Sequence, residues 1–210
     1  MTKKKSSTPS FRRKAAQAPP SRSKIPSWVW LAAGGVGVVL LVIGLFYLGN
    51  QGPATANSDI EGVEILPNPG GGHQEGEIAH ADEVPVGGVH NPEWQNCGIY
   101  DEPVREETVI HSMEHGAVWL AYQPDLSGDR VETLRNLVRQ ERSSKGEPLI
   151  VLAPKPSLDA PIVVTAWRVQ LKLENAADER LAQFLQRYQR GPFTPEPGAN
   201  CVGSVGEPLN

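Results

Sequence analysis

The longest apolar run in the chain divides it into three parts. Residues 28–48 contain no charged side chain, and this length is sufficient for one helix to cross a bilayer. Trp28, Trp30 and Tyr47 lie near the ends of the run, where aromatic rings favour the membrane interface. The pattern therefore predicts a transmembrane helix over residues 27–49, with a polar tail before it and a longer folded part after it.

Beyond the linker of residues 50–59, short apolar segments alternate with segments rich in turn-forming residues. Apolar residues at helical spacing predict helices over residues 105–115, about 127–142 and 177–190. Continuous or alternating apolar residues predict strands over residues 60–66, 117–122, 149–152 and 162–171. This order predicts an α+β domain over residues 60–210, with a small mixed β-sheet covered by helices. A long loop is predicted over residues 73–103, and loops of that length are usually functional or disordered.

The distribution of charge predicts how the chain is oriented. The tail of residues 1–26 carries eight Lys or Arg residues and no acid, a composition that predicts disorder. Basic residues on only one side of a span keep that side cytoplasmic. The sequence thus predicts a single-pass cell-membrane protein with an extracytoplasmic domain. Cleavage of a signal peptide after Ala56 is the alternative, although the apolar run exceeds the roughly 7–15 residues of a signal h-region.

Composition also limits the partners of the folded part. The net charge of the chain is −4, and removing the tail's eight positive charges leaves −12, from 24 acidic and 12 basic residues. An acidic domain is a poor candidate for nucleic-acid binding, so the expected partners are the membrane and an unidentified envelope protein. Both cysteines, Cys97 and Cys201, follow the predicted span, and an oxidising compartment favours a disulfide between them.

The candidate chemistry centres on histidine. All five histidines lie within residues 73–115, and two of them occur in the hexad His111-Ser112-Met113-Glu114-His115-Gly116. Positions i and i+4 share a helix face, so two imidazoles there can bind one metal ion. The sequence predicts one copper or zinc ion, with copper slightly favoured, and the predicted ligands are His115, His111, His90 and His73. Glu114 is a further ligand or a partner of one, whereas Met113 faces the other side of the helix.

Two other interpretations of the hexad remain open. Its letters also match H-x-x-E-H, the inverted zinc-peptidase motif, in which both histidines bind zinc and the glutamate activates water. A four-letter motif often occurs by chance, and the domain is small for such an enzyme, so no enzymatic activity is predicted. The other interpretation is a non-catalytic envelope scaffold, or interaction module, whose histidines only hydrogen-bond to loop carbonyls.

Three segments resemble a known family: Trp94 to Pro103, His111 to Trp119 and Asp159 to Trp167. They are similar to a bacterial membrane-anchored family called domain of unknown function 3105, and the resemblance covers about Ile60 to Cys201. It implies no activity. It does imply that both cysteines and four of the histidines belong to the family pattern, namely His73, His90, His111 and His115. The family tends to have tyrosine at the position of His80, and Val84 to Gly88 departs from its Pro-Pro-Thr-Ser-Gly run.

Overall fold

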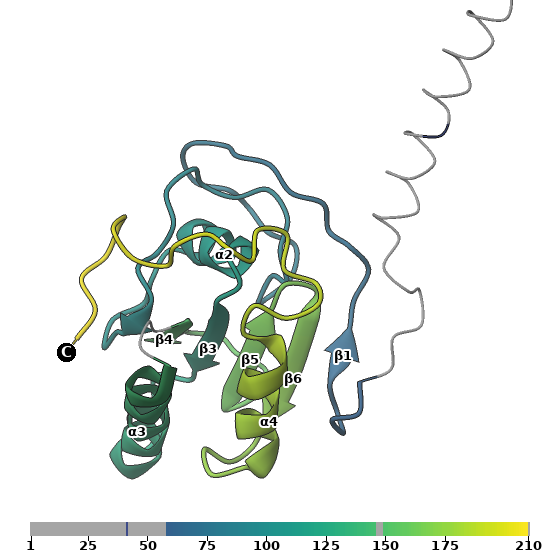
Figure 1. Ribbon diagram of the computed structural model, residues 1–210. Coiled ribbons are helices and arrows are strands. Elements are labelled where there is room, and N and C mark those ends of the chain that lie inside the picture. Colours follow the sequence, from purple (N-terminus) through teal and green to yellow (C-terminus); the bar gives the residue numbers. More distant parts are fainter. Residues whose placement is uncertain (1–40, 42–57, 146–148, 210) are drawn as a thin grey trace, which may run out of the picture. The chain divides into compact units, whose positions relative to one another are not determined.

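The computed structural model describes residue 41, residues 58–145 and residues 149–209 (Figure 1). The predicted tail, transmembrane helix and most of the linker lie outside the described residues, apart from Leu41. Within the described residues, no helix has the length and apolar character that a membrane crossing requires. The folded part of the chain lies within the compact unit Gln51–Asn210.

The described residues form a six-stranded mixed sheet in the order β1-β6-β5-β3-β4-β2. Its parallel half consists of β2 (Gly98–Ile99), β4 (Ile150–Pro154) and β3 (Val118–Tyr122). The antiparallel half continues from β3 through β5 (Ile162–Ala166) and β6 (Val169–Leu173) to β1 (Glu64–Ile65). The predicted α+β fold with a mixed sheet is therefore confirmed.

Helices cover the two faces of this sheet (Figure 1). Side chains from α3 (Gly128–Lys145) and α4 (Glu179–Tyr188) pack in one core, together with alternate residues of β3 such as Leu120. Residues of α2 (Glu106–Glu114) pack on the opposite face, against the other set of β3 side chains, including Trp119. Every residue of β3 is buried, as a central strand covered on both faces must be.

One predicted strand is wrong, because residues 162–171 form a hairpin instead of a single strand. The chain reverses at Trp167 and Arg168, so that β5 and β6 pair antiparallel. Arg168 has a φ of +67°, the left-handed conformation that tight hairpins use. Neither residue is the glycine or asparagine that usually marks such a turn, so the apolar pattern continues through the reversal. The predicted first strand is also shorter than expected, since only Glu64–Ile65 pairs with the sheet.

The disulfide between Cys97 and Cys201 is confirmed, with 5.4 Å between the two Cα atoms. Both cysteines are buried in the core beneath α2. The Cys97 amide also donates to the Cys201 carbonyl at 2.7 Å, so the two segments are joined by the backbone as well. The disulfide therefore fixes the C-terminal segment beside the loop that precedes α2.

Candidate metal centre

Helix α2 carries the hexad and has well-defined ends. It begins after Arg105, with Glu106 and Glu107 in the first turn, where acidic groups interact favourably with the helix dipole. It ends where Gly116 takes a φ of +99°, and a Cβ at that position would lie 2.9 Å from the Cα of Arg190. This left-handed conformation, which favours glycine, ends the helix and turns the chain towards β3. Met113 is fully buried in the core, as expected for a side chain facing away from the histidines.

Two loop histidines are placed side by side by a short piece of β-structure. His73 and His90 form an isolated parallel bridge. In this bridge the amide of Gln74 donates to the His90 carbonyl at 2.8 Å, and the His90 amide donates to the Gly72 carbonyl at 2.9 Å. Residues paired in a sheet direct their side chains to the same face. The two imidazoles consequently lie close together, with ring centroids 4.8 Å apart.

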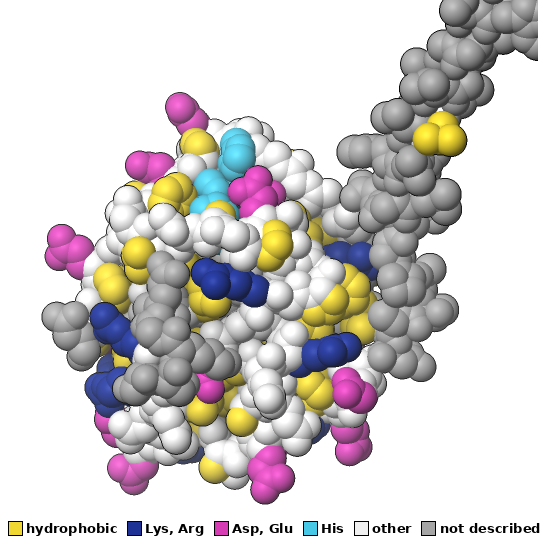
Figure 2. Space-filling view, in the orientation of Figure 1, with side chains coloured by type: hydrophobic (Ala, Val, Ile, Leu, Met, Phe, Trp, Pro, Cys, Tyr) yellow, Lys and Arg dark blue, Asp and Glu magenta, His cyan; other side chains and the backbone are white. Residues whose placement is uncertain are grey.

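Four side chains from these elements converge to form what we call the His/Glu cluster: His73, His90, His111 and Glu114. Each offers one ligand atom, and all four atoms lie within 4.8 Å of one another. His90 is completely buried and the Glu114 side chain is 12% exposed, whereas the His73 side chain is 51% exposed. Figure 2 shows histidine side chains directly beside an acidic side chain on one face of the domain. This set of donors could hold one metal ion that is reached from the surface past His73.

Hydrogen bonds to the backbone leave the outer nitrogens of these rings available. The Nδ1 atom of His90 lies 2.8 Å from the Gly88 carbonyl oxygen, and Nδ1 of His111 lies 2.8 Å from the Asn91 carbonyl oxygen. A carbonyl can only accept, so each Nδ1 carries the proton and each neutral ring keeps a lone pair on Nε2. Metal-binding histidines are commonly oriented in this way.

A close polar contact joins His90 to Glu114. Nε2 of His90 lies 3.1 Å from Oε2 of Glu114, and Nε2 of His73 lies 3.8 Å from the same oxygen. With Nδ1 donating to Gly88, a neutral His90 would direct a lone pair at a carboxylate. Either a proton or a metal ion between the two atoms removes this repulsion.

The electrostatics of His111 favour a neutral ring. Burial lowers the pKa of His111 from 6.5 to about 4. The hydrogen bond to the Asn91 carbonyl opposes this shift, while His115, His90 and His73 lower the pKa further. A neutral imidazole is the form that binds metal ions. His111 is therefore ready to act as a ligand at neutral pH without first losing a proton.

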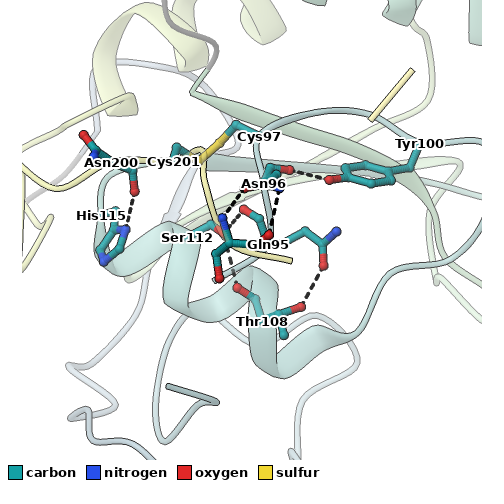
Figure 3. Close-up of a disulfide and its surroundings, with 10 residues drawn as sticks. Gln95, Asn96, Cys97, Tyr100, Thr108, Ser112, His115, Asn200 and Cys201 are labelled. Atoms are coloured by element: carbon teal, nitrogen blue, oxygen red, sulfur yellow. Dashed lines mark hydrogen bonds between the residues drawn. A yellow bond between two sulfur atoms is a disulfide. The ribbon is translucent and has the colours of Figure 1, made fainter. Parts of the chain in front are cut away.

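His115 lies outside the cluster, although the sequence placed it first among the ligands. Its Nδ1 is 2.5 Å from the carbonyl oxygen of Asn200, a residue next to the disulfide (Figure 3), and its Nε2 is 3.9 Å from Oε2 of Glu196. Its ring still packs against His111, with centroids 4.6 Å apart. Glu114, left open as ligand or partner, is the residue that completes the group of four.

Several residues around the cluster were not identified from the sequence. The carbonyls of Gly88 and Asn91 orient two rings, but backbone acceptors leave no signal in side-chain patterns. Trp94 packs against His111 and His115, with ring centroids 5.7 and 5.2 Å apart. His80, at a position where the family tends to have tyrosine, is not a member of the cluster.

Comparison with known proteins identifies a family that covers this whole site. The model of the family described as "Protein of unknown function (DUF3105)" matches residues 73–203, which is more than half of the 210-residue chain. The chain belongs to this family. No curated protein and no solved structure gives a significant match. The matched region begins at His73 and extends beyond Cys201, so it contains the complete cluster and the disulfide.

Proposed function

We propose that this domain binds one divalent transition-metal ion through His73, His90, His111 and Glu114. The observation that carries the proposal is the convergence of four ligand atoms within 4.8 Å, with Nε2 of His90 3.1 Å from Oε2 of Glu114. A hydrogen-bonding scaffold would not need to bring three imidazoles and a carboxylate to one point. The burial of His90 and His111 adds support, because water has little access to hydrogen-bond to their ring nitrogens.

The type of donor restricts the metal. Three imidazole nitrogens and one carboxylate oxygen suit zinc or Cu²⁺, whereas Cu⁺ prefers sulfur ligands. Among the described residues no sulfur ligand is available to the cluster, since Met113 is buried in the core and both cysteines are in the disulfide. We therefore propose zinc or Cu²⁺. The slight preference for copper predicted from the sequence applies only to its divalent form.

The geometry favours metal binding over a peptidase active site. The inverted peptidase motif requires both histidines on the zinc ion, with the glutamate free to activate water. In this domain Glu114 lies with His111 in the cluster, and His115 is directed at Asn200.

We propose that metal binding takes place outside the cell, with residues 27–49 as the membrane anchor and an envelope protein as the partner.

Metal retention by the purified full-length protein tests this function. The protein is freed of metal with a chelator, incubated separately with Zn²⁺ and Cu²⁺, and desalted. Its metal content per chain is then measured by elemental mass spectrometry. We expect about one ion per chain in the wild type and none after combined replacement of His90 and His111 by alanine. His80→Ala is the matched control, because it removes a histidine outside the cluster. Absence of metal from the wild type at every pH from 5 to 8 would leave the scaffold interpretation.

A further inference from the structure

His73 is held in the cluster by only a few bonds. It belongs to what we call the His73 arm, residues 67–78, in which every residue from 67 to 77 is exposed. The backbone bridge to His90 is one attachment of this arm. Because such a segment has little buried surface to hold it, the remaining polar attachments decide whether its imidazole stays near Glu114.

A buried carboxylate on α2 provides another attachment. Oε1 of Glu107 accepts the amide hydrogen of Ile78 at 3.0 Å, five residues beyond His73. The side chain of Glu107 is only 8% exposed, and its Oε2 lies 3.7 Å from Nε of Arg105. Arg105 also donates from Nη2 to the Gly76 carbonyl at 3.0 Å. Acidic side chains are rarely buried without a specific partner, and here the partners are the Ile78 amide of the His73 arm and the Arg105 guanidinium.

The backbone of Glu107 also contacts the residue that orients His111. The main-chain carbonyl of Glu107 accepts the amide of Asn91 at 3.1 Å, and the Asn91 carbonyl in turn receives the proton of His111 Nδ1. Positions 107, 111 and 114 are spaced i, i+4 and i+7, so they form one stripe along α2. The C-terminal two are in the cluster, while the first attaches the segment that carries His73.

We infer that Glu107 is a positioning residue, which holds the exposed ligand His73 over the metal site through the Ile78 amide. This inference rests on the proposed function. It separates the cluster into a part fixed by burial, namely His90, His111 and Glu114, and one ligand whose position depends on a carboxylate at the other end of the helix. Removing the Glu107 carboxylate should therefore lower metal affinity in the same way as removing His73, but by less.

Zinc titration of the full-length protein against a chromophoric chelator tests this inference. Glu107→Ala should weaken Zn²⁺ binding about 10-fold, the effect typical of a residue that orients a ligand. Glu107→Gln keeps an oxygen acceptor for the Ile78 amide and should stay within about 2-fold of the wild type. Glu106→Ala is the matched control, because Glu106 lies in the same turn but pairs with Lys155. Arg105→Ala, at a side chain that is 55% exposed, should fold normally and weaken binding about 2-fold to 3-fold.

A His73→Ala background distinguishes positioning from a general structural role. If Glu107 acts through His73, adding Glu107→Ala to His73→Ala should change affinity by less than about 2-fold. Hydrogen exchange of the metal-free protein should show faster exchange in residues 72–78 of Glu107→Ala. An undiminished loss of affinity in the His73→Ala background would overturn the inference, as would an unchanged affinity in Glu107→Ala. A wild type that binds no zinc or copper would instead overturn the proposed function itself.

Discussion

Two regions that meet on α2 use the same residue type for different purposes. In the His/Glu cluster, His111 directs Nε2 towards two other imidazoles and a carboxylate. Four residues later, His115 donates to the Asn200 carbonyl beside a disulfide, in a region that we call the tail anchor (His115, Glu196, Asn200 and Cys97–Cys201). The first region gathers ligand atoms, whereas the second joins the C-terminal segment to the helix. Equal spacing on a helix face therefore does not imply an equal role.

The disulfide is the strongest test of this division. Replacing Cys97 and Cys201 together with serine should lower the free energy of unfolding by about 4 kcal/mol, because the bridge spans 104 residues of sequence. Zinc affinity of the folded variant should remain within about 10-fold of the wild type, since neither cysteine is a cluster member. Urea unfolding and zinc titration check the two quantities. A variant that keeps its stability but loses its zinc would contradict the division into two regions.

His111→Ala tests the cluster itself. It should weaken Zn²⁺ binding by at least about 100-fold, since even residues that only orient a ligand cost 10-fold to 100-fold. Competition with a chelator of known affinity provides the measurement. His115→Ala is the matched control, because it removes the other imidazole of the same helix. Equal losses in both variants would show that the tail anchor is part of the metal site.

Acidification should reveal the buried ring of His111. The pKa of His111 is lowered to about 4 in the folded protein and is near 6.5 when unfolded, so between these values the unfolded chain binds more protons. The stability of the metal-free protein should therefore be highest above pH 6.5 and fall as the pH drops towards 4, by about 3 kcal/mol at most from this group. His111→Asn should remove that part of the pH dependence. His80→Asn should leave it in place, and thermal unfolding across this pH range is the measurement.

The smallest expected effect is that of His115→Ala on stability. The variant loses a hydrogen bond to the Asn200 carbonyl, which is worth about 1 kcal/mol. The packing of the ring against His111 and Trp94 adds to this loss. Zinc affinity should change by no more than a few-fold, so the variant sharpens the contrast with His111→Ala. Urea unfolding of the metal-free protein measures the difference, and an unchanged midpoint would contradict a role in holding the tail.

The sequence by itself determined much of the framework. Buried strands at residues 118–122 and 150–154 and the three described helices follow from runs and stripes of apolar residues. The disulfide was favoured because both cysteines follow the predicted span. The hexad contains two members of the His/Glu cluster, His111 and Glu114, which share a helix face at i and i+3. The β5–β6 hairpin, in contrast, was not predicted, because its turn at Trp167 and Arg168 contains no glycine or asparagine.

Only the tertiary structure decided which histidines meet. His73 lies beside His90 because an isolated backbone bridge pairs these two loop residues, and the Asn91 amide binds the Glu107 carbonyl of α2. Such pairing leaves no periodic pattern in the sequence. His115 turns to Asn200 because the disulfide places a carbonyl on that side of the helix end. Side-chain spacing sets the direction in which a helical residue can point. The contact that it finally makes depends on which backbone acceptors and carboxylates the rest of the chain brings to it.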